Sequence, residues 1–215
     1  LGMNKEEVLK FVSVGDSITR ERGLVEMGNC VNCKSLDNRV SVFILIEALK
    51  ILKGQEIPYD FYAVFTVQEE IGIRGAQVAT MSVQPDFGIC IDTTIAFDTP
   101  GAADHEKITT LGEGTAVKIM DSRTVCDQRM VKFMKETADN NNITWQPEIL
   151  TGGGTDTQAL QQFTAGGSIA GAISIPTRHI HQVIEMCDKS DIQGSLDLLV
   201  ACVKTMDQYD WEYSL

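Results

Sequence analysis

Short runs of consecutive apolar residues alternate with longer helical segments along most of this sequence. The runs are rich in β-branched and aromatic residues, as is typical of strands that are buried on both faces of a sheet. This alternation predicts an α/β fold with a mostly parallel central sheet that helices cover on both faces. The expected strands are residues 61–67, 87–92, 116–120, 144–150 and 168–175.

The clearest helical segment is residues 40–53, which are apolar almost all round. This pattern favours a helix that is buried on most of its sides, and Gly54 is a residue type that often ends a helix. Residues 1–30 differ in sequence pattern from the rest of the chain, which suggests that they are the end of a second, smaller domain. Further helices are expected at residues 4–12, 75–81, 127–140, 155–163 and 192–206.

The balance of charge limits the partners that we expect. Asp and Glu number 30 against 18 Lys and Arg, which gives a net charge of −12. An acidic surface repels phosphate backbones, so nucleic acid is not an expected partner. No apolar run is long enough to span a bilayer, so we expect no membrane partner either.

The six cysteines indicate a reducing compartment. Cys30 and Cys33 form the only C-x-x-C pair, and a structural zinc site would need a second pair at similar spacing. Cys90 and Cys202 lie in apolar runs, where cysteine behaves as a small hydrophobic residue. We therefore expect reduced thiols and a cytoplasmic protein.

Acidic residues lie where the expected strands end. Asp37 comes just before an expected helix, and Asp92 closes an expected strand. Glu69 and Glu70 follow directly after another strand. In open α/β sheets, ligands bind beyond the carboxyl ends of the strands. Carboxylates that meet there would repel one another unless a cation neutralises them, so the sequence predicts a metal site.

His181 follows the last expected strand and can supply the imidazole that zinc prefers alongside carboxylates. A site with these ligands suits zinc or cobalt better than magnesium or calcium. Neighbouring side chains of an extended segment point opposite ways. One of Glu69 and Glu70 can therefore bind metal while the other takes a proton from water as a general base.

Each of these features has a plainer explanation when it stands alone. Single acids at strand ends are often only solvated, and a single histidine more often lies on the surface or at a helix cap. The glycine run at 152–154 also fits a plain turn, and it lacks the Lys-Ser/Thr of a phosphate-binding loop. The prediction of a metal site therefore rests on the combination of these features and on their order.

Taken together, these residues resemble a known family, the dinuclear-metal aminopeptidases that include the TET peptidases and the glutamyl aminopeptidases. The resemblance covers nearly the whole chain, and its most specific parts are the QEE-G-RGA and LDNR motifs. The matching segments are KSLDNR at 34–39, VQEEIGIRGA at 67–76, IDTT at 91–94, DTPG at 98–101, GGTD at 153–156 and IPTRHIH at 175–181.

The resemblance implies a site for two divalent metal ions, with zinc preferred over cobalt and manganese. It implies that Asp37 bridges the two ions and that Asp92 binds the first. Glu70 and His181 bind the second ion, and Glu69 is the general base and acid. The peptide bond after Asp37 is expected to be cis, as it is in the family.

The resemblance also implies a substrate cleft beside the metals. Asp156 is expected to contact the α-ammonium group of the substrate. His179 stands where the family usually has Tyr, and it would be either an additional ligand or a supporting residue. The residues expected to line the cleft are Gly153, Gly154, Thr155 and Asp156.

One feature of the family is missing here. In the family, the first metal ligand is a His in an H-x-D motif. None of His105, His179 and His181 lies in such a motif. By the resemblance, residues 1–30 are the end of an inserted β domain that serves dimerisation, and residues 31–215 are a zinc-aminopeptidase-like catalytic domain without its N-terminal part. We therefore expect a portion of a longer protein that has little activity on its own.

The expected function is metal-dependent hydrolysis of N-terminal residues from short peptides. One alternative is a metal-dependent deacetylase or a related hydrolase, which would not need a free amine on its substrate. A second alternative is an incomplete, inactive piece with a structural or assembly role, which metal stoichiometry would reveal. The resemblance further implies homo-oligomers, typically of twelve subunits.

Overall fold

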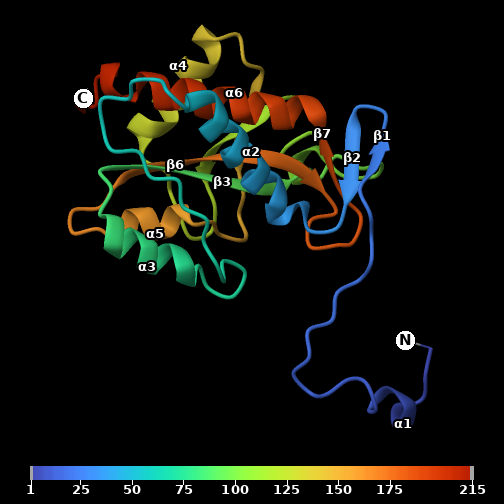
Figure 1. Cartoon of the computed structure of the whole chain (residues 1–215). Coiled ribbons are helices and arrows are strands. Elements are labelled where there is room, and N and C mark those ends of the chain that lie inside the picture. Colours follow the sequence, from blue (N-terminus) through green and yellow to red (C-terminus); the bar gives the residue numbers. More distant parts are fainter. Residues whose placement is uncertain (1, 214–215) are drawn as a thin grey trace.

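A seven-stranded mixed sheet forms the centre of the structure, a computed structural model that describes residues 2–213 (Figure 1). The strands are β1 (Val25–Met27), β2 (Cys30–Cys33), β3 (Phe87–Ile95), β4 (Thr115–Met120), β5 (Trp145–Ile149), β6 (Ile169–Arg178) and β7 (Glu185–Asp188). The long strand β6 is central: it pairs in parallel with β3 along most of its length, and antiparallel with β4 and β7 over shorter stretches.

The predicted α/β class is confirmed, but the sheet is less parallel than the sequence predicted. The β3–β6 and β4–β5 pairings are parallel, whereas β1, β2 and β7 add antiparallel pairings. The sequence analysis did not predict β2 and β7 as strands. Only Gly28 and Asn29 separate β1 from β2, and so short a connection can join only antiparallel strands.

Helices cover both faces of the sheet, as expected (Figure 1). They are α1 (Lys5–Val8), α2 (Leu36–Leu52), α3 (Arg74–Val83), α4 (Gln128–Asn140), α5 (Thr157–Gln162) and α6 (Lys189–Thr205), with short 3-10 turns at η1 (Asp104–Glu106) and η2 (Met206–Gln208). Figure 1 shows α2, α4 and α6 on one face, and α3 and α5 on the other. The sheet is therefore buried between two helical layers, as its apolar strands require.

The main core lies between the sheet and the layer of α2, α4 and α6. Ile44, Phe133 and Leu198 from the helices share one cluster with Val117 and Ile173 from the sheet, and each is at most 2% exposed. Helix α4 begins where the Asp127 carboxylate accepts the backbone N–H of Arg129. Its buried residues recur at intervals of three and four, which is the spacing of one helix face.

The strand expected at residues 61–67 does not form. The segment carries the right residue types, but none of the strands within residues 2–213 pairs with it. Its apolar side chains are therefore largely open to solvent, with Tyr62 60% and Val67 69% exposed. Val67 O instead accepts the backbone N–H of Gly75 at 2.9 Å, so the segment leads directly into α3. Strand propensity needs a neighbouring strand before it stabilises a structure.

The N-terminal part contains the short helix α1, which lies away from the sheet at the end of an extended stretch (Figure 1). A domain boundary at residue 30 stays a prediction. Cys30 and Cys33 are free and lie three apart on β2, so their side chains point to opposite faces of the strand. They cannot share a zinc ion there. Among the described helices, none has both the length and the apolar character needed to cross a membrane.

Candidate metal centre

Three of the predicted metal ligands meet at one place. Asp37 comes from the start of α2, Glu70 from the loop before α3, and His181 from the loop after β6. The Nε2 atom of His181 lies 3.0 Å from Asp37 Oδ2 and 3.2 Å from Glu70 Oε2. Ligand atoms about 2.1 Å from a tetrahedral zinc ion lie about 3.4 Å from one another. The spacing and the donor types therefore fit a zinc-like ion.

The backbone at Asp37 departs from helical geometry, and nearby contacts hold it in place. The peptide bond between Asp37 and Asn38 is cis, as the family resemblance implied. The N–H of Asp37 donates to Glu185 Oε2 at 2.9 Å, and Asn38 Nδ2 donates to the carbonyl oxygen of Ile91 at 3.1 Å. The second contact ties the start of α2 to β3, one residue before Asp92.

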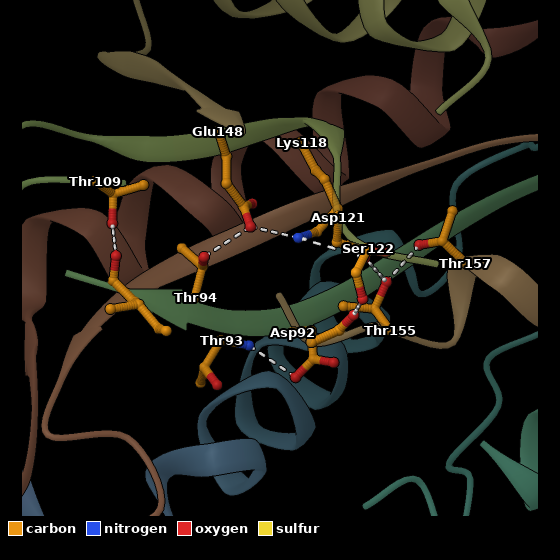
Figure 2. Close-up of polar contacts among 12 residues, drawn as sticks. Asp92, Thr93, Thr94, Thr109, Lys118, Asp121, Ser122, Glu148, Thr155 and Thr157 are labelled. Carbon is orange, nitrogen blue, oxygen red and sulfur yellow. Dashed lines mark hydrogen bonds and ion pairs between the residues drawn. The ribbon is translucent and has the colours of Figure 1, made fainter. Parts of the chain in front are cut away.

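Asp92 lies within β3 and is only 8% exposed. Its Oδ1 accepts the backbone N–H of Thr93 at 2.8 Å (Figure 2). Burial, together with the nearby carboxylates of Asp37 and Glu69, raises the pKa of Asp92 well above its usual range. The Asp92 carboxylate thus lies near the Asp37 end of the site, although it is not one of the three ligands that converge most closely.

Glu69 is half-buried beside the same acids. Burial, followed by the carboxylates of Asp156, Glu70 and Asp37, raises its pKa to about 7, while His181 opposes the rise. Repulsion among these carboxylates is what a bound cation would relieve. The adjacent residues Glu69 and Glu70 lie in the turn that leads into α3 rather than in an extended segment.

The 153–156 loop brings Asp156 to this cluster. Asp156 Oδ2 accepts a hydrogen bond from Thr66 Oγ1 at 2.6 Å, and Thr66 precedes Glu69 by three residues. The other oxygen, Oδ1, is buried and has no partner within residues 2–213. Burial raises the pKa of Asp156, and the Thr66 hydrogen bond partly offsets that effect. Gly153 and Gly154 lie in the same loop, and Thr155 is buried beneath it.

An opening of about 360 Å³ leads to the converging ligands. Besides Asp37, Glu70 and His181, its walls include the cations Arg20 and Lys34. His179 and His105 do not join the cluster: both are exposed, and His105 belongs to η1.

The sequence analysis missed residues that hold the ligands rather than bind metal, namely Glu185, Asn38 and Thr66. Glu185 is 2% exposed and follows His181 by four residues. Its position after His181 was a signal, but it was one acid among the 30 Asp and Glu residues.

Comparisons with known proteins identify the family. Residues 2–198 match the family model of the M42 glutamyl aminopeptidases. The glutamyl aminopeptidase of Lactococcus lactis is 32% identical over 207 residues, which is 95% of this chain and 57% of that protein. The chain spans about half the length of the curated relatives it matches, between 49% and 59%.

Two solved structures share the fold. An aminopeptidase from the archaeon Desulfurococcus kamchatkensis superposes with a TM-score of 0.87 at 36% identity, covering 93% of this chain and 56% of that chain. A TET1 peptidase of Pyrococcus horikoshii, described as assembling into a tetrahedron or a large octahedral shell, gives 0.80 at 28% identity, with 93% and 58% covered. On the extent of these matches, the chain belongs to the M42 glutamyl aminopeptidase family.

Proposed function

We propose that this chain forms catalytic machinery of a metal-dependent aminopeptidase, a hydrolase that removes N-terminal residues from short peptides. The observation that carries the proposal is the convergence of Asp37, Glu70 and His181, with ligand atoms within 4.8 Å of one another. Membership of an aminopeptidase family supports the reaction class.

The proposed metal site holds two divalent ions, zinc first and cobalt or manganese as alternatives. Asp37 has two carboxylate oxygens, so it would hold both ions, while Asp92 would hold one ion and Glu70 with His181 would hold the other. When bound, such ions polarise the peptide carbonyl and lower the pKa of the attacking water.

Glu69 is the proposed general base. It takes a proton from the attacking water and returns it to the nitrogen of the leaving amine, so that the peptide C–N bond breaks. A pKa of about 7 is close to the value at which a group can do both near neutral pH. The buried free oxygen of Asp156 is the proposed partner of the substrate's α-ammonium group, which would restrict cleavage to the end of a peptide.

The proposal also covers the location and the oligomeric state of the whole protein. Free thiols at all six cysteines support a cytoplasmic location. The TET1 relative's described assembly supports a homo-oligomer, with twelve subunits as the expected number.

The decisive experiment is made on the whole protein and combines metal content per chain with the activity of Glu69→Gln. We expect two metals per chain, full metal retention in Glu69→Gln, and loss of turnover on a free-amine peptide. Glu56→Gln, at an exposed glutamate, is the matched control and should keep full activity. Full activity of Glu69→Gln, or cleavage of N-acetylated peptides as fast as free ones, would contradict the proposal.

A specific observation favours one second candidate, a chain that binds a single ion and is inactive. Only Asp37, Glu70 and His181 form a close ligand cluster among the described residues. One metal per chain and no peptide cleavage would support this candidate.

A further inference from the structure

A buried ion-pair network lies against β3, the strand that carries Asp92, and the proposed chemistry does not use it (Figure 2). Lys118 on β4 and Glu148 on β5 are register partners, 1% and 0% exposed. Lys118 Nζ donates to Glu148 Oε1 and lies 3.7 Å from Oδ2 of Asp121, which is 2% exposed. A buried ion pair is seldom more stabilising than apolar residues of the same size. This network therefore calls for an explanation other than stability.

One arm of the network reaches the strand that carries a proposed metal ligand. Glu148 Oε1 also accepts a hydrogen bond from Thr94 Oγ1 at 2.7 Å (Figure 2). Thr94 follows Asp92 by two residues on β3, so both side chains point to the same face of the sheet. Lys118 is thereby anchored, through Glu148, to the strand that carries Asp92.

The other arm reaches the loop that carries Asp156. Thr155 Oγ1 lies 3.4 Å from Asp121 Oδ2 and 3.0 Å from Thr157 Oγ1 (Figure 2). Ser122 Oγ donates to the carbonyl oxygen of Gly153. The turn that begins at Asp121 therefore contacts the loop at two points just before Asp156.

We propose that Lys118 is a positioning residue: by binding Glu148 and Asp121 together, it fixes the 152–157 loop, and hence Asp156, relative to β3. The significance of this for catalysis rests on the proposed function, but the structural effect on the loop does not. Loop residues have few stabilising contacts of their own. The charged Lys118 side chain, at the base of the turn that begins at Asp121, therefore determines where the loop lies.

The charges explain why a lysine suits this place. Burial by itself lowers the pKa of Lys118, but the carboxylates of Glu148 and Asp121 outweigh that effect and raise the pKa, so Lys118 stays charged. Glu148 Oε2 is already buried without a partner in the described part of the chain. Without the lysine, two buried carboxylates would face each other with no cation. The turn at Asp121 would then have to move outward or admit water.

The test is hydrogen exchange followed by mass spectrometry on the folded chain. Lys118→Met removes the positive charge but keeps an unbranched side chain. Asp121→Asn is a near-isosteric second variant, and it removes only the negative charge that faces Lys118. Lys132→Met, at a lysine whose side chain is 63% exposed, is the control. We expect exchange of residues 158–160, whose backbone N–H groups donate to the carbonyl oxygens of Thr155 and Asp156, to quicken at least about tenfold in both variants. Exchange of α6 should stay within about twofold.

Unchanged exchange at residues 158–160, or equal acceleration in α6, would overturn the proposal, because Lys118 would then have no specific effect on the loop. If Lys118→Met does not fold, Asp121→Asn decides by the same criterion. In active protein we further expect KM for a free-amine peptide to rise more than kcat falls, with metal content unchanged. A whole protein without activity would refute the proposed function but leave the exchange result standing.

Discussion

Glu69→Gln should make the metal-free protein more stable at alkaline pH while it abolishes turnover. The pKa of Glu69 is raised from 4.5 to about 7, chiefly by burial and by neighbouring carboxylates. A rise of this size corresponds to about 3 kcal/mol against the ionised form. Because Glu69 is only half-buried, solvent screens the repulsion, and we reduce the figure to about 1–2 kcal/mol.

The pH window follows from the direction of the shift. The folded protein binds this proton more tightly than the unfolded chain, so ionisation of Glu69 destabilises the fold. The cost is absent below a pH of about 4.5, grows through the window, and is complete above a pH of about 7. The glutamine side chain in the Glu69→Gln variant carries no charge, so the variant escapes the cost at every pH.

Thermal unfolding in the presence of a chelator measures the effect. At pH 8.5 we expect the Tm of Glu69→Gln to exceed that of wild type by about 2–8 °C, given about 2–4 °C per kcal/mol for a chain of this length. At pH 4.5 the two Tm values should agree. Glu56→Gln, at an exposed glutamate, should show no difference at either pH. A lower Tm for Glu69→Gln at pH 8.5 would refute the reasoning about repulsion in the site.

Three further predictions test other contacts. Zinc at about one hundred times its Kd should stabilise the wild type by about 2.7 kcal/mol in a thermal-shift assay, and His181→Ala should lose that gain. Arg178→Ala should cost about 1–3 kcal/mol in urea unfolding, because it leaves Asp98, held at 2.6 and 2.9 Å by two guanidinium nitrogens, buried without its cation. Burial alone would raise the pKa of Asp98, but the Arg178 contact outweighs it and lowers the pKa, so the cost should shrink as the pH falls below about 4. Asp191→Asn should cost about 1–3 kcal/mol in the same assay, because both Asp191 oxygens accept backbone N–H groups and an amide offers only one acceptor.

The sequence predicted the fold best where a segment's own residues determine its structure. Helix α4 and strand β6 were expected because their apolar spacing is clear and the neighbours that bury them are present. Residues 61–67 were mispredicted because their strand propensity depends on a partner strand, and none of the described strands pairs with them. Strand β7 was missed because its four residues, EMCD, carry no β-branched side chain and owe their conformation to β2 and β6.

In the candidate site, too, the sequence predicted the residues themselves better than the contacts that hold them. The rule that ligands gather at strand ends identified acids that the structure does bring together, although their roles as ligands stay predictions. The contacts that fix them were beyond sequence reasoning, because Glu185 and Lys118 lie far along the chain from what they hold. A buried lysine inside an apolar strand gave no signal of its own, and its acidic partner Glu148 became evident only from the pairing of β4 with β5.

The site as a whole favours metal binding over stability of the empty protein. His181 lies in a loop and has a positive φ of 63°, which few non-glycine residues adopt. Asp92 and Glu69 are held where burial disfavours their charges. Each of these features costs stability in the absence of a cation. A bound cation would relieve the repulsion at Asp92 and Glu69 and would take His181 as a ligand. A protein selected only for a stable fold would replace at least one of these acids with a neutral side chain, so their presence together is an argument for metal-dependent function.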